Sequence, residues 1–187
     1  MLLPSPRDPI YTPDTWHRQN YQFVACLKLE DSIGLYKASR YMASIYLAGY
    51  AIESAFQALY CFQRGLLKTD HGGAKAHNVT TFLTFLDTTT QNVISLNYPN
   101  AWANISLYWG GGGVFNLRYN PNSTSQNDAR TFLCSVLVIH EYLSGEINRL
   151  SIPPGMVPVS TPTSYSNLSN SIHSSLKTEL EYGGTGF

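Results

Sequence analysis

The sequence predicts an all-α protein, an antiparallel up-and-down bundle of four to five helices. Between residues 41 and 62 apolar side chains recur at steps of three and four, which is the spacing of one face of a helix. The stretch 33–64 around them contains no proline. No segment shows the strict alternation of apolar and polar residues that a half-buried strand requires. Together these observations favour helices and predict no sheet.

Two helices are expected in the first third of the chain. Residues 12–14 (Thr-Pro-Asp) form an N-cap signal with proline at the first helical position, and this helix should end near Lys28. Asp31 and Ser32 should begin a second helix over residues 33–64, about 45–50 Å long at 1.5 Å per residue. Gly65 should end it, and a loop should follow at 70–73.

Shorter helices and one further long helix are predicted after this loop. Asn78 should cap a short helix that reaches Leu86, and residues 102–109 should add one or two turns after a break at Pro99. A last long helix, capped by Ser125 or Asn127, should end near residue 150.

The predicted organisation has three parts. Residues 1–12 are an N-terminal extension, and residues 13–150 are the helical bundle. Residues 151–187 are a tail rich in serine, threonine and proline, a composition that cannot build a core of its own. We expect part of this tail to pack on the body or on a neighbouring subunit.

The charge balance excludes one class of function. Twelve Lys and Arg residues offset twelve Asp and Glu residues, so no global basic field attracts nucleic acid or a membrane. Charged residues make up only 13% of the chain, against about 25% in an average globular protein. Low charge favours a protein whose surface is partly covered by a partner or a second copy.

Nothing in the sequence indicates export, a membrane span, a metal or a cofactor. The first residues contain no apolar leader segment, and the longest charge-free apolar stretch, 41–52, is shorter than a bilayer span. Cys26, Cys61 and Cys134 form no CxxC pair and are expected to be buried free thiols. We therefore expect a cytoplasmic protein without a metal site or cofactor.

Several segments resemble one known family. Residues 40–58, RYMASIYLAGYAIESAFQA, are similar to the second-helix signature of HEPN domains (higher eukaryotes and prokaryotes nucleotide-binding), in the prokaryotic group with the pattern YLAGYAxE. Residues 76–83, AHNVTTFL, resemble the "gHdLxxL" segment of the family. Trp109, Leu117-Arg118-Tyr119 and Asp128-Ala129 resemble its "W…lRY…dA" segment. The resemblance covers about residues 15–150.

The resemblance implies a helical bundle that dimerises through its long helices. HEPN proteins include partners of minimal nucleotidyltransferases in toxin–antitoxin pairs, defence ribonucleases, and non-catalytic nucleotide-binding or scaffold modules. A fold shared by these classes does not select among them.

The catalytic pair that the family would imply is missing from its expected place. Catalytic members carry an Arg followed after four to six residues by a His, which together support metal-independent attack by a ribose hydroxyl. Arg118 occupies the corresponding position, but no His follows within that window, and His140 lies too far beyond Arg130. Arg64 and His71 have the spacing but lie at the end of the second helix. A chance match is the simpler interpretation of that pair.

Glu53 is the most informative charged residue. On a helical wheel it lies away from the apolar stripe, beside Tyr46, Tyr50, Gln57 and Tyr60. One interpretation is a polar, aromatic pocket for a nucleotide base or a partner's arginine. The alternative, which we favour, is a carboxylate buried between helices and satisfied by tyrosine hydroxyls, Arg40 or Arg118.

Three further motifs have weaker interpretations. His77, with His71, has a spacing that suits no usual zinc site, so packing or capping is favoured over phosphate or metal binding. The glycines at 110–113 lack the lysine and serine or threonine of a phosphate loop and indicate a connection. Arg118 and Tyr119 remain binding candidates through the resemblance.

We therefore expect an accessory or binding HEPN-type module. It would form a homodimer and associate with a protein such as a minimal nucleotidyltransferase, or with a nucleotide or RNA, and not with a membrane. A metal-independent endoribonuclease toxin that uses Arg64 and His71 is the alternative. A structural assembly subunit is a third possibility. It predicts a large polymer in solution, and a discrete dimer would argue against it.

Overall fold

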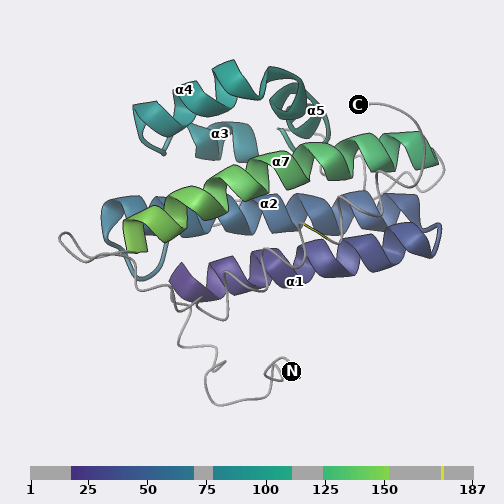
Figure 1. The fold of residues 1–187 in the computed structure, drawn as a ribbon, viewed down its shortest axis with the longest axis horizontal. Helices are drawn as coiled ribbons and strands as arrows, with labels where there is room; N and C mark the ends of the chain where they lie inside the picture. Colours follow the sequence, from purple (N-terminus) through teal and green to yellow (C-terminus); the bar gives the residue numbers. More distant parts are fainter. Residues whose placement is uncertain (1–17, 70–77, 111–123, 152–173, 175–187) are drawn as a thin grey trace, which may run out of the picture.

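The computed structural model describes residues 18–69, 78–110, 124–151 and Ser174 of the chain (Figure 1). Within these residues every regular element is a helix, which confirms the all-α prediction for the described part. The helices are α1 (Arg18–Lys37), α2 (Tyr41–Arg64), α3 (Val79–Leu83), α4 (Thr88–Asn97), α5 (Pro99–Trp109) and α7 (Gln126–Ser151). The predicted extension, the loop at 70–73 and the tail beyond residue 151 lie outside the described residues, apart from Ser174.

Helices α1 and α2 form an antiparallel hairpin, and the predicted break near Lys28 is wrong. Helix α1 continues through Asp31 and Ser32, and the chain turns only at residues 38–40, where Ser39 adopts a left-handed φ of 59°. The Ser32 hydroxyl donates to the carbonyl of Leu29 at 2.6 Å. Such a bond back to the preceding turn belongs to a helix interior, so Ser32 does not act as a cap.

The 24 residues of α2 make it about 36 Å long, shorter than predicted. Gly65 ends it as predicted, with a left-handed φ of 66°, and the amide of Leu66 bonds to the carbonyl of Cys61 at 2.8 Å. Every residue from 55 to 61 is buried, because α1, α7, α3 and α5 all contact this helix. Helix α2 is therefore the centre of the fold.

Between α2 and α7 the described residues form the three short helices α3, α4 and α5. Asn78 caps α3 as predicted, and its side-chain oxygen accepts from the amides of Thr80 and Thr81 at 3.1 Å each. Helix α3 stops at Leu83, short of the predicted end. Helix α4 was not predicted; Asp87 caps it by accepting from the amide of Thr90 at 2.7 Å.

Helices α5 and α7 begin at recognisable residues. Helix α4 ends at Asn97, so the chain does break just before Pro99, and Pro99 itself occupies the first turn of α5, where its missing N–H costs no hydrogen bond. Ser125 precedes α7 and exchanges hydrogen bonds with Asp128, whose carboxylate accepts from the Ser125 amide at 3.0 Å. The Ser125 hydroxyl in turn accepts from the Asp128 amide at 3.1 Å. Of the two predicted caps, Ser125 makes these contacts.

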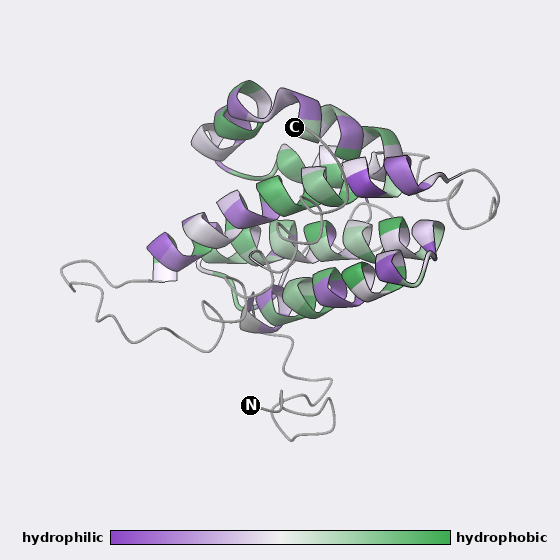
Figure 2. Ribbon diagram, turned by 45° about the vertical axis from the view of Figure 1, so that its right-hand side comes forward, coloured by the Kyte–Doolittle hydropathy of each residue, from purple (hydrophilic) through white to green (hydrophobic). Residues whose placement is uncertain are grey.

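Contacts between the helices fix the direction of the chain. Gln63, near the end of α2, contacts Asp87 before α4, whereas Trp109, at the end of α5, packs against Tyr46 near the start of α2. Helices α4 and α5 thus return the chain, and α2 and α7 run in the same direction (Figure 1). The long helices α2 and α7 also pack directly against each other, so this neighbouring pair is parallel and not antiparallel as predicted from the sequence, because α4 and α5 carry the chain back between them. Helices α3, α4 and α5 lie on the side of α7 and α2 away from α1 (Figures 1 and 2).

All three cysteines lie in the described ranges and none forms a disulfide; Cys26 and Cys61 are buried as predicted, while Cys134 is half-buried. None of the helices in the described ranges has both the length and the apolar character of a membrane span.

Candidate functional site

Glu53 lies in the interior of the helical layers and links α2 to α5. Only 5% of the residue is exposed. Its Oε1 accepts from Nε2 of Gln57, one turn further along α2, at 3.3 Å. Its Oε2 accepts from the indole Nε1 of Trp109 at 3.4 Å. The carboxylate therefore joins two helices that are 56 positions apart in the sequence.

Three aromatic rings gather beside this carboxylate. The hydroxyls of Tyr46 and Tyr50 are 3.0 Å apart, within hydrogen-bond distance. Their ring centroids lie 5.7 and 5.3 Å from that of Trp109, in edge-to-face arrangements that suit aromatic quadrupoles. Trp109 itself is fully buried. We call Tyr46, Gly49, Tyr50, Glu53 and Trp109 the Trp109 cluster.

The geometry of the Trp109 cluster favours a carboxylate that holds helices together. Both carboxylate oxygens are directed at donors of the protein itself. Arg40, one of the partners expected from the sequence, precedes α2 and lies about 20 Å from Glu53 along the helix axis. Tyr60 also lies elsewhere, because its ring packs against Phe82 of α3 at 5.7 Å.

Arg64 occupies a different part of α2. It is the last residue of the helix and is exposed, about 16 Å along the axis from Glu53. Its Nη2 is 3.5 Å from the carbonyl oxygen of Phe85, and its guanidinium lies 5.8 Å from the centre of the Tyr60 ring. A cation at this position also suits the negative end of the helix dipole.

The structure brings together only some of the residues predicted as a site. Tyr46, Tyr50 and Glu53 are adjacent, and Arg64 is separate from them. The remaining candidates lie outside the described residues: His71, His77, Arg118 and Tyr119. Gly110 ends α5, and its amide bonds to the carbonyl of Ser106 at 2.8 Å, whereas glycines 111–113 also lie outside the described part.

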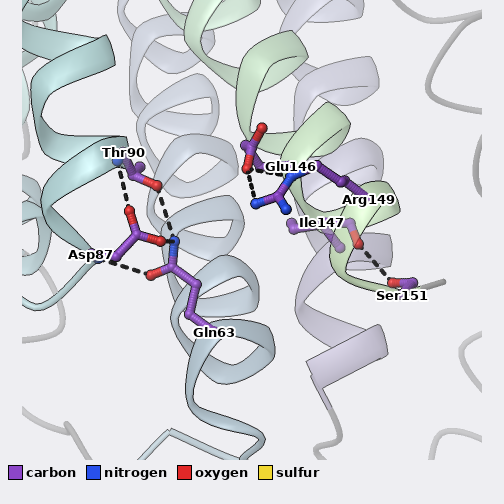
Figure 3. Close-up of polar contacts among 7 residues, drawn as sticks. All are labelled: Gln63, Asp87, Thr90, Glu146, Ile147, Arg149 and Ser151. Atoms are coloured by element: carbon purple, nitrogen blue, oxygen red, sulfur yellow. Dashed lines mark hydrogen bonds and ion pairs between the residues drawn. The ribbon is translucent and has the colours of Figure 1, made fainter. Parts of the chain in front are cut away.

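A second polar cluster joins α2 to α4 and was not predicted. Nε2 of Gln63 donates to Oδ2 of Asp87 at 2.6 Å and to Oγ1 of Thr90 at 3.0 Å. Its Oε1 accepts from the amide of Asp87 at 3.0 Å (Figure 3). We call these three residues the Gln63 clamp. Helix α4 was not predicted, and Asp87 and Thr90 at its start lie 24 and 27 positions from Gln63, so no local signal indicated these contacts.

The end of α7 lies beside this clamp. Arg149 pairs with Glu146 at 2.7 Å on α7 (Figure 3). Burial raises the pKa of Tyr142, and a hydrogen bond to Thr90 partly offsets this shift. These contacts attach α4 to both α2 and α7.

His140 is a fully buried ionisable residue on α7. Its Nδ1 lies 3.5 Å from the hydroxyl of Ser144, one turn later. The structure thus places it in the core, consistent with its poor spacing from Arg130. Among the described residues, no group of three or more His, Cys, Asp or Glu side chains is arranged to hold a metal ion.

Comparisons of the chain with protein-family profiles, with curated proteins and with solved structures gave no match.

Proposed function

We propose that this protein is an accessory binding module, a helical bundle that acts by association and not by chemistry of its own. The observation that supports this function is the environment of Glu53. A carboxylate that is 5% exposed, with its oxygens directed at Gln57 and Trp109, stabilises the contact between α2 and α5. This structural role leaves Glu53 without a need for a catalytic one, and it therefore supports a module that acts by association.

The nature of the partner follows from the resemblance of residues 15–150 to HEPN domains. In this proposal the chain forms a homodimer and binds a protein such as a minimal nucleotidyltransferase of a toxin–antitoxin or defence system. A nucleotide or RNA is a second ligand of the same assembly. The half-buried Tyr46 and Tyr50, on the outer side of the Trp109 cluster, are the aromatic side chains that such a ligand would meet first.

Arg64 favours the alternative function, a metal-independent endoribonuclease. Its side chain is exposed, and within the described ranges it makes no ion pair, so its guanidinium is accessible to a phosphate. In that mechanism Arg64 would stabilise the charged transition state, and His71 would transfer the proton of the ribose hydroxyl.

An assay of RNA cleavage in EDTA separates the two functions. The purified chain is compared with an Arg64→Ala/His71→Ala variant on the same RNA. We expect no cleavage by either protein, together with retention of a partner protein when the tagged chain is purified from its own cells. Cleavage by the wild type alone would establish the ribonuclease and overturn the binding module. Cleavage by both would also overturn it and would direct attention to Arg118.

A further inference from the structure

The outer helices α4 and α5 carry no charge. Residues 88–109 contain no Asp, Glu, Lys, Arg or His. At the chain's own charged share of 13%, about three such residues would be expected over this length. Uncharged helices are ordinary in a core, but these two lie at the outside of the fold, away from α1 (Figures 1 and 2).

The uncharged helices expose a mixed face of amides, hydroxyls and leucines. Leu96 of α4 is 76% exposed and Leu107 of α5 is 72% exposed, the two highest values among the large apolar residues described. We call the exposed residues of these helices the α4–α5 face. They are Thr88, Thr89, Asn92, Ser95, Leu96, Asn97, Pro99, Asn100, Ala103 and Leu107.

This composition is that of an interface and not of a free surface. Soluble proteins interleave charges over their exposed helices, because charges oppose association and keep apolar side chains apart. The centres of protein interfaces, in contrast, are depleted of charged residues. A nucleic acid or a strongly charged protein would find no counter-charge on the α4–α5 face.

We propose that the α4–α5 face is the surface through which two copies of this chain associate about a two-fold axis. A two-fold contact places the same patch on both sides, so a charged patch opposes itself, whereas an uncharged patch does not. Amides and hydroxyls both donate and accept, and therefore pair with identical groups across the axis. Leu96 and Leu107 become buried in this contact. The proposal rests on the homodimer of the proposed function and places its surface on α4 and α5, in place of the long helices that the resemblance implies.

The test measures mass in solution for the full chain and for matched variants. By light scattering after size exclusion, from about 1 to 100 µM, we expect the wild type to reach about 42 kDa, twice the 20.8 kDa of one chain. A Leu96→Lys/Leu107→Lys variant should weaken the dimer at least about a hundredfold and run as a monomer. Both positions are exposed, so its circular dichroism should match the wild type.

Two further variants make the result specific. Leu67→Lys places the same charge on a leucine that is 59% exposed but follows α2, and it should leave the dimer intact. Ala103→Arg, on the α4–α5 face, should dissociate it. A wild type that stays monomeric, a double variant that stays dimeric, or a mass that rises without limit would overturn the proposal. The result of the RNA cleavage assay does not affect these masses. The proposed dimer surface and the proposed binding function can therefore be refuted independently.

Discussion

Gly49 of α2 and Trp109 of α5 are in direct contact. A Cβ atom built on Gly49 would lie 2.2 Å from Cε3 of the indole, far inside the contact distance of two carbons. A glycine inside a helix costs roughly 1 kcal/mol relative to alanine. At this position the cost is offset, because the missing side chain lets the indole reach the carboxylate of Glu53.

Replacing Gly49 with alanine should therefore destabilise the fold although it improves helix propensity. The new methyl group collides with three carbons of the fully buried indole, and overpacking of this kind typically costs about 1–3 kcal/mol. Urea unfolding followed by circular dichroism measures the change.

Gly34 provides the matched control. It also lies within a helix, α1, and a Cβ atom there meets nothing within 4 Å. Gly34→Ala should raise the free energy of unfolding by roughly 0.5–1 kcal/mol. Similar losses for both variants would show that the contact with Trp109 is not the cause.

Glu53→Ala should lower stability or disrupt assembly. The change removes the acceptor of the buried Trp109 indole N–H and of the Gln57 amide, and an unsatisfied buried donor costs about 1–3 kcal/mol. The melting temperature and the mass in solution report the effect. If both stay at wild-type values, Glu53 does not stabilise the contact between the helices and the pocket interpretation gains support.

A double-mutant cycle tests whether the effect acts through Trp109. Trp109→Phe keeps an aromatic ring in the Trp109 cluster but removes the indole N–H. If the hydrogen bond is the link, the loss from Glu53→Ala should shrink by about 0.5–1.5 kcal/mol in the Trp109→Phe background. Strict additivity would place the role of Glu53 elsewhere.

Local signals predicted the parts of the fold that depend on local chemistry. Asn78 could be predicted as a cap because four consecutive residues determine the contact. In the structure its side chain accepts from the amides two and three residues later. Ser32 was misread because the same residue type also bonds to the preceding turn inside a helix. Helix α4 was missed because three threonines begin it, and β-branched residues are weak helix formers.

The site was harder to predict, because only one of its two carboxylate contacts is local in the sequence. A helical wheel correctly placed Glu53 beside Gln57, one turn away, since that pair is set by helix geometry. It did not identify Trp109 as the second donor, because that contact spans 56 positions and depends on how α5 packs against α2. Long-range contacts of this kind leave no periodic pattern in a single sequence.

The Gln63 clamp should control the local stability of α4. Gln63→Ala removes bonds to the Asp87 carboxylate, the Asp87 amide and the Thr90 hydroxyl. Because Asp87 still caps α4, we expect a global loss of only about 1 kcal/mol but clearly faster hydrogen exchange of the first amides of α4. Gln126→Ala, whose only described side-chain contact is a 3.5 Å approach to Tyr36, is the control. Unchanged exchange in α4 would show that the clamp does not restrain it.

The Ser125–Asp128 pair should make stability depend on acid pH. Hydrogen bonds from the side chain and backbone of Ser125 hold the pKa of Asp128 below its ordinary value. A lowered pKa in the folded state means that the contribution is complete above the unfolded value, near 3.8, and is lost as the pH falls through the folded value. Ser125→Ala should cost about 1 kcal/mol at pH 7, and less at pH 2–3. An equal loss at both pH values would contradict this linkage.

The thiol of Cys134 should be unreactive although it is only half-buried. Burial raises its pKa to about 11, and the nearby charge of Arg130 only partly opposes this shift. The thiolate is the reactive form, so at pH 8 its fraction is about a hundredfold lower than for a thiol of pKa 9. We expect the folded protein to react slowly with an aromatic disulfide reagent. Once unfolded in guanidinium, it should release three equivalents of the reagent's thiol, one for each cysteine. A fast phase that disappears in Cys134→Ser would show that the thiol is activated.

Because the folded pKa is raised, the same thiol should also reduce stability as the pH rises from about 9 towards 11.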